Sequence, residues 1–218
     1  MQSLRAPCRP FTHAKAAPAA RRRTVVVRAQ QGLKLYVPGT YENQVLDILM
    51  GTAMQAQQAA SCYNNCLATS VALVKATQVL GLAGFTATFG HLGSTREGVN
   101  AAVPHVWVQY KDQYVLDATL SDVLPTEELF KFKSQLKYIP GRAENPMPNV
   151  GLPKEADSQD KLEYWVDNMD EYLMLLARAD ANTPQAAASL LCHVLPEALA
   201  PVKDDLLMLL QQAEATTM

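Results

Sequence analysis

A segment rich in proline and glycine divides the chain and limits how far any helix or central strand can extend. Residues 140–153 include four prolines and two glycines. Proline lacks the backbone N–H that helix interiors and central strands need, so neither element runs through this segment. We therefore predict an α+β core at residues 31–140, a proline-rich connector at residues 141–155 and a helical region at residues 156–218.

The first 30 residues have the composition of an organellar transit peptide. Residues 1–29 contain seven Lys or Arg side chains and no acid. They also lack the run of about 7 to 15 apolar residues that follows the first charges of a secretory signal. The end of this segment, residues 25–29, resembles the cleavage region of green-algal chloroplast transit peptides. This resemblance implies import into the chloroplast stroma, with a mitochondrial transit peptide or a retained basic tail as alternatives.

Without its basic front, the chain is acidic. Of the 19 Lys and Arg residues 12 remain, against all 21 Asp and Glu residues, which gives a net charge of −9. Binding to nucleic acid requires clustered Lys and Arg for the phosphates, so we expect no nucleic-acid partner. The chain also has no run of about 18 apolar residues, so we expect no membrane span. Apolar residues at 49% and charged residues at 18% are typical of a soluble globular domain.

The hydrophobic pattern before the connector alternates between helical and strand periods. Apolar residues recur every three or four positions in some stretches, as on one face of a helix, and alternate in others, as in a strand. The predicted elements are helices at 41–59 and from Cys62 or Cys66 to Leu80, a strand at 85–89, a loop at 90–100, and strands at 103–110 and 113–117.

The last two strands are predicted to form a hairpin that carries His105 and Asp117. Strands in a hairpin lie about 5 Å apart, so side chains on them can contact each other. A two-residue turn at residues 111–112 offsets His105 and Asp117 by one position. A bulge or a three-residue turn is expected to place them directly opposite each other.

Cysteine, histidine and aspartate together are the residue types that thiol catalysis requires. A free thiol is mostly protonated at neutral pH, and a helix N-terminus or a nearby imidazolium favours the reactive thiolate. The imidazole returns a proton to the leaving group, and a carboxylate holds the imidazole in one tautomer. Cys62 and Cys66 lie near the start of a predicted helix, on one face of it if both are helical.

The order of these residues resembles the transglutaminase-like superfamily, which is related to papain-like cysteine hydrolases. Residues 105–108 (His-Val-Trp-Val) and 114–119 (Tyr-Val-Leu-Asp-Ala-Thr) match its His-Asp hairpin position by position. Its nucleophile begins a helix that ends at a glycine about fifteen residues later, which fits Cys66 and Gly81. A rival alignment takes Cys62 as the nucleophile. Residues 62–65 (Cys-Tyr-Asn-Asn) resemble the Cys-Tyr-X-Asn start seen in some small bacterial and phage relatives.

The resemblance implies an α+β fold in which a helix bearing the cysteine packs on a small antiparallel sheet bearing His and Asp, followed by a C-terminal helical extension. It implies a hydrolase or acyltransferase that acts on amide bonds of a peptide or glutamine-type substrate through a thioester, without a cofactor or metal. The implied site consists of Cys66 or Cys62 as nucleophile, His105 as base and acid, Asp117 as its orienting group, backbone N–H groups with Asn65 or Gln58 as oxyanion donors, and Trp107 as a wall.

Three other interpretations stay open at this point. The fold can serve as a noncatalytic interaction module that binds a protein partner through the helices of residues 156–214, since the cysteine lacks the preceding Gly-X of active transglutaminases. Cys62 and Cys66 can form a redox pair. The same two cysteines with His91 or His105 can form a zinc site, although their spacing is not that of a zinc finger.

Overall fold

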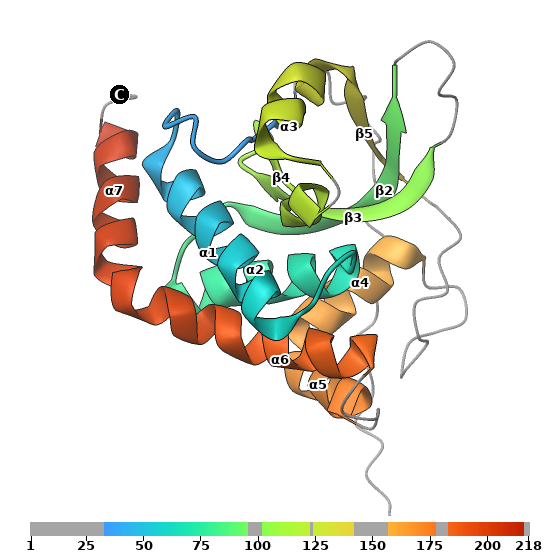
Figure 1. Ribbon diagram of the computed structural model, residues 1–218. Helices are drawn as coiled ribbons and strands as arrows, with labels where there is room; N and C mark the ends of the chain where they lie inside the picture. The colour runs from blue at the N-terminus through green and yellow to red at the C-terminus, as the bar shows by residue number, and fades with distance from the viewer. Residues whose placement is uncertain (1–32, 96–101, 123, 142–156, 178–182, 216–218) are drawn as a thin grey trace, which may run out of the picture.

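The computed structural model describes residues 33–95, 102–122, 124–141, 157–177 and 183–215. Figure 1 shows an α+β fold in which a curled sheet lies above a layer of helices. The predicted fold class is therefore confirmed. The predicted transit peptide and most of the predicted connector lie outside the described residues.

The sheet has five strands in the order β1-β4-β3-β2-β5. Four of them pair antiparallel, but β1 pairs parallel to β4, so the sheet is mixed and the prediction of an antiparallel sheet is wrong in this detail. Two residues of β1 are too few to show any periodicity in the sequence. The strands are β1 (Lys34–Leu35), β2 (Phe85–Ser94), β3 (Val103–Tyr110), β4 (Tyr114–Leu116) and β5 (Leu136–Pro140).

Strand β2 is twice as long as the sequence pattern predicts. Residues 90–94, expected to be a loop, continue the strand because they pair with β3 on one side and with β5 on the other. Gly90 pairs with both His105 and Pro140. A Cβ atom added at Gly90 meets the carbonyl oxygen of Ile139 at 2.1 Å. The glycine that suggested a loop is there because β5 approaches the strand too closely for a side chain.

Helices α1 and α2 are defined by their caps. Asn43 accepts a hydrogen bond from Leu46 N at the start of α1, and Asn65 accepts one from Ala68 N at the start of α2. The second cap fixes the first helical residue of α2 as Cys66, not Cys62. The helices are α1 (Gln44–Ala60), α2 (Cys66–Leu80), α3 (Thr126–Phe132), α4 (Ser158–Asp167), α5 (Met169–Ala177), α6 (Pro184–Leu199) and α7 (Lys203–Ala215).

The C-terminal helices belong to the same hydrophobic core as α1, α2 and the sheet. Helix α6 packs against both α1 and α2, and α4 packs against β2 and α2. Trp165 of α4 and Leu195 of α6 are almost completely buried in one cluster with Leu73 of α2 and Val108 of β3. Figure 1 shows α6 crossing beneath α1 and α2. None of the helices in the described part of the chain is long and apolar enough to cross a membrane.

Candidate active site

The β3–β4 hairpin brings His105 and Asp117 to one face of the sheet. Tyr110 pairs with Tyr114, so the connection has three residues and not two. Two of them, Lys111 and Asp112, have positive φ values of 48° and 55°. The last printed pair of this register is Val108 with Leu116, and one further step would set Asp117 against Trp107. His105 is therefore a diagonal neighbour of Asp117, because the three-residue connection is centred on Asp112 and not on Lys111, the centre that would set the two directly opposite.

Asp117 is held by three hydrogen-bonding groups. Its Oδ2 atom lies 2.6 Å from His105 Nε2 and accepts a hydrogen bond of 2.9 Å from the Tyr138 hydroxyl. Its Oδ1 atom accepts a bond of 2.6 Å from the Thr119 hydroxyl. The carboxylate is almost fully buried, with 2% of its side chain exposed. Because Tyr138 and Thr119 fix the carboxylate, the carboxylate fixes the orientation of the His105 ring.

Cys66 completes the constellation from the helical layer. It is the first residue of α2, is partly exposed, and is one of the neighbours that raise the pKa of His105. The cysteine at the start of α2 is thus a neighbour of His105, which is itself bonded to Asp117 just after β4.

His105 is held in its charged form by this arrangement. Burial on its own lowers the pKa of His105, but the hydrogen bonds to Asp117 and Cys66 outweigh it and raise the pKa from 6.5 to about 10. A raised pKa means that folding favours the protonated ring. The stability that His105 contributes is therefore complete below about pH 6.5 and is lost as the pH rises through about 10.

Cys62 lies in a different environment. It is in the connection between α1 and α2, so it does not share a helix face with Cys66 and that expectation is wrong. It is buried, and burial together with the charge of Asp122 raises its pKa to about 11. Such a thiol is a weak nucleophile at neutral pH. Of the two cysteines considered for the nucleophile, Cys66 and not Cys62 contributes to the raised pKa of His105.

Of the predicted wall and oxyanion residues, Trp107 and Asn65 lie beside the candidate site and Gln58 faces solvent. Trp107 is fully buried, and its ring is stacked 6.5 Å from the ring of His105. Asn65 lies next to Cys66 and caps α2 with its side-chain oxygen. Gln58, by contrast, is exposed in the last turn of α1, because the inward face of that turn is taken by Gln57. Gln58 therefore lies on the solvent side of α1.

Two hydrogen-bonding groups of the site escaped the sequence analysis. Gln57 is buried and donates to Thr69 Oγ1 at 3.2 Å and to Asp122 Oδ2 at 3.4 Å, next to the start of α2. Tyr138 reaches Asp117 from β5, a strand that was not predicted. The alternation of Leu136, Tyr138 and Pro140 with two more exposed residues was the available signal for that strand.

The metal and redox alternatives gain no geometric support. Across the described residues, no group of three or more His, Cys, Asp or Glu side chains is arranged to hold a metal ion. His91 lies in β2, where it pairs with Pro104 and Ile139. Cys62, Cys66 and Cys192 are free thiols.

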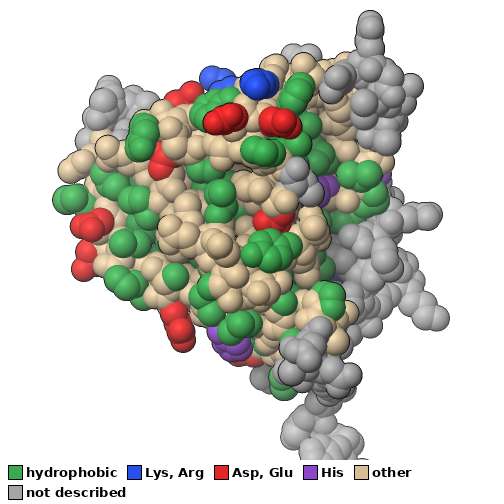
Figure 2. Space-filling model, in the orientation of Figure 1, with side chains coloured by type: hydrophobic (Ala, Val, Ile, Leu, Met, Phe, Trp, Pro, Cys, Tyr) green, Lys and Arg blue, Asp and Glu red, His purple; other side chains and the backbone are tan. Residues whose placement is uncertain are grey.

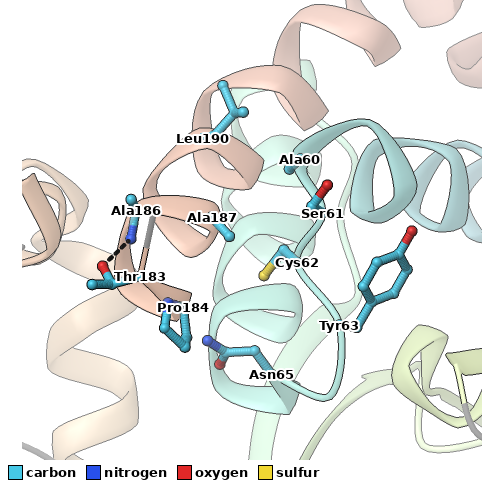
Figure 3. Close-up of a pocket in the computed structure, with 10 residues that line it drawn as sticks. All are labelled: Ala60, Ser61, Cys62, Tyr63, Asn65, Thr183, Pro184, Ala186, Ala187 and Leu190. Carbon is cyan, nitrogen blue, oxygen red and sulfur yellow. Dashed lines mark hydrogen bonds between the residues drawn. The ribbon is translucent and has the colours of Figure 1, made fainter. Parts of the chain in front are cut away.

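A cavity of about 480 Å³ adjoins the start of α2. Figure 3 shows it between the α1–α2 connection, which contributes Cys62 and Asn65, and the first turns of α6, which contribute Ala187 and Leu190. Figure 2 shows that Lys and Arg side chains on this side of the molecule gather at its upper edge. The side chains that line this cavity are uncharged.

Removing the Tyr138 hydroxyl is expected to destabilise the fold more than removing the hydroxyl of Tyr36. Tyr138→Phe deletes a hydrogen bond to a buried carboxylate, whereas Tyr36→Phe deletes one of the same length, 2.9 Å, to the backbone oxygen of Asn43 and a longer one, 3.4 Å, from the backbone nitrogen of Asn43. We expect losses of about 2 kcal/mol and about 1 kcal/mol in the free energy of unfolding, measured in urea. Equal losses would mean that the Tyr138–Asp117 bond contributes no more than a neutral one.

No protein-family model matches the chain, and the chain likewise matches no curated protein and no solved structure. The chemistry of the site is therefore inferred from its own geometry.

Proposed function

We propose that the protein is a cysteine-dependent hydrolase or acyltransferase that acts on amide bonds of a peptide or glutamine-type substrate. The observation that carries the proposal is Cys66 at a helix start beside His105, which is bonded to Asp117. Cys66 is favoured over Cys62 as the nucleophile, because it begins α2, is partly exposed and contributes to the raised pKa of His105, whereas Cys62 is buried.

In the proposed reaction, the Cys66 thiolate attacks the carbonyl carbon of the substrate amide. The C–N bond breaks, His105 gives its proton to the leaving amine, and the acyl group remains on Cys66 as a thioester. Water or a second amine then attacks the thioester. His105 takes a proton from this attacking group, the C–S bond breaks, and the thiolate is restored. Asp117 keeps the histidine ring oriented through both steps.

The negative charge that develops on the carbonyl oxygen requires hydrogen-bond donors. The first N–H groups of a helix have no carbonyl partner within it, which in α2 applies to Cys66 and Leu67. The N–H groups of Ala68 and Thr69 are already bound to Asn65. The backbone N–H groups of Cys66 and Leu67 are therefore the proposed oxyanion donors, with the side-chain amide of Asn65 beside them.

Alkylation of the thiols tests the proposal before any substrate is known. The rate of carbamidomethylation of each cysteine is measured against pH by mass spectrometry, in the parent and in His105→Ala. A Cys66–His105 pair keeps Cys66 reactive at about pH 6, where an ordinary thiol of pKa about 8.5 is nearly inert. We expect His105→Ala to slow Cys66 at this pH by roughly tenfold or more, because the imidazolium that favours the thiolate is gone.

His91→Ala is the matched control, because His91 is a second histidine of the same sheet and bonds to neither Cys66 nor Asp117 in the described contacts. It should leave the pH profile of Cys66 unchanged. If Cys66 reacts at about pH 6 no faster than a free thiol, and His105→Ala changes nothing, the catalytic proposal is wrong. A noncatalytic role of the fold then becomes the better interpretation.

The proposed place of action is the chloroplast stroma. The support is the composition of residues 1–29, with seven Lys or Arg side chains and no acid. These residues lie outside the described part of the chain.

A further inference from the structure

The connection between α1 and α2 has a backbone conformation that its own residues do not favour. Ser61 and Asn64 have positive φ values of 51° and 54°, a region that residues other than glycine rarely adopt. Ser61 ends α1, where this conformation is common because it lets the backbone N–H bond back to the last turn. Asn64 ends no helix, so another contact has to fix its conformation. Figure 3 shows the connection running from Ala60 to Asn65 at the start of α2.

Asp122 supplies that contact. Its Oδ2 atom accepts a hydrogen bond of 3.0 Å from the backbone N–H of Asn64 and one of 3.4 Å from the side-chain amide of Gln57. Gln57 is buried near the end of α1, and its amide also donates to Thr69 Oγ1 in the first turn of α2, at 3.2 Å. Asp122 therefore ties the connection to the end of one helix and, through Gln57, to the beginning of the next.

Asp122 belongs to the segment that carries the carboxylate of the candidate site. It is the last residue of a short 3-10 helix, η1 (Ala118–Asp122), which begins directly after Asp117 and packs against α1 and α2. Asn64, to which Asp122 is bonded, directly precedes the residue that caps α2. One hydrogen bond thus joins the segment that holds the carboxylate to the segment that leads into the helix of the cysteine.

The surroundings of the Asp122 carboxyl group disfavour its charged form. Burial raises the pKa of Asp122 above its usual value, and although the hydrogen bond from Asn64 lowers the pKa, the charge of Asp117 raises it again. Acids placed at such a cost are found most often at functional sites. The charge environment therefore supports a role for Asp122 that goes beyond filling space.

We infer that Asp122 is a positioning residue of the candidate site, whose hydrogen bond with Asn64 fixes the α1–α2 connection and thereby the place of Cys66 beside His105. The inference rests on the proposed function, since it takes Cys66 as the nucleophile. In this role Asp122 acts through the backbone of the connection. The role requires an oxygen acceptor at the right distance from the Asn64 N–H, and it does not require the negative charge.

Three variants of Asp122 test this role through the alkylation rate of Cys66 at about pH 6. Asp122→Ala removes the acceptor and is expected to slow Cys66 roughly tenfold, as His105→Ala does, because the thiol is no longer held beside the imidazolium. Asp122→Asn keeps an oxygen of the same reach and should stay within about twofold of the parent. Asp122→Glu keeps the charge but lengthens the side chain by a methylene group, and should slow Cys66 at least about fivefold.

Asp47→Ala is the matched control, because Asp47 Oδ1 accepts a backbone N–H of another loop, that of Gly39 at 2.8 Å, near the other end of α1. It should lower the free energy of unfolding in urea and leave the pH profile of Cys66 unchanged. The urea transition also shows whether each variant is folded before its rate is measured. If Asp122→Ala is unfolded, the contrast between Asp122→Asn and Asp122→Glu decides.

The inference is wrong if folded Asp122→Ala keeps the parent pH profile of Cys66, or if Asp47→Ala slows Cys66 equally. It is also wrong if Asp122→Glu reacts like the parent while Asp122→Asn is slow, because the charge and not the position would then matter. The failure of the proposed function gives a different pattern. The parent Cys66 then reacts at about pH 6 no faster than a free thiol, His105→Ala leaves the rate unchanged, and the inference falls together with the proposal.

Discussion

Replacing Cys66 by alanine is expected to abolish acyl transfer, with a loss of about 10⁴-fold or more in the rate of acyl-enzyme formation. The thiol at the start of α2 is the one that contributes to the raised pKa of His105, and alanine has no nucleophilic group to replace it. The measurement is the burst of p-nitrophenolate released when p-nitrophenyl acetate acylates the protein. A mass increase of one acetyl group, mapped to Cys66, identifies the acyl-enzyme.

Cys62→Ala separates the two candidate nucleophiles. Cys62 is buried and its pKa is raised to about 11, so its removal costs the burst less than about tenfold, through the altered cavity alone. Cys192→Ala controls for the loss of a buried thiol, because Cys192 lies in α6 outside the cavity lining. A burst that survives in Cys66→Ala and disappears in Cys62→Ala would assign the chemistry to Cys62 and contradict the site described here.

Gly90→Ala is expected to lower the free energy of unfolding by about 3 kcal/mol. The new Cβ atom meets the carbonyl oxygen of Ile139 at 2.1 Å and the Trp107 ring at 2.7 Å. Both neighbours are constrained, because Ile139 is paired backbone of β5 and Trp107 is fully buried. The strand pair β2–β5 must therefore separate, which also moves Tyr138 away from Asp117.

Gly93→Ala in the same strand is the matched control for this change. Its added Cβ atom meets nothing closer than the Cβ of Ala102 at 3.8 Å, an ordinary contact. We expect its unfolding free energy in urea to stay within about 0.5 kcal/mol of the parent, or to rise slightly from the reduced freedom of the unfolded chain. Equal stabilities of the two variants would show that β5 does not press on β2 as described.

The parts of the fold that the sequence predicts well are those with a clear period. Strand β3 begins and ends at the predicted residues because its apolar side chains face a buried layer. The parts that were missed depend on partners distant in the chain. Residues 90–94 are strand because they pair with β5 and in part with β3, and a two-residue strand such as β1 has no period at all.

The candidate site also combines features that the sequence predicts with features that it misses. The types and order of the cysteine, histidine and aspartate are visible in the sequence, and so is their resemblance to a known hairpin. The choice between Cys62 and Cys66 depends on where α2 begins, which Asn65 decides as its cap. Gln58 is exposed because α1 is rotated so that Gln57 faces the core. A sequence pattern locates the start of a helix only to within one or two residues, so it does not fix which of the two faces inward. Tyr138 was missed with its strand.

The position of α6 has a consequence for when the protein acquires its chemistry during synthesis. Cys66 lies at the start of α2, and α2 is packed against α6, whose residues Leu191, Leu195 and Leu199 are fully buried in the common core. A ribosome completes the cysteine, the histidine and the aspartate well before it reaches residue 184. Until α6 emerges, α2 has no partner for that face and Cys66 has no fixed place beside His105. The proposed nucleophile is therefore expected to reach its final place only late in synthesis, after the C-terminal helices have been made.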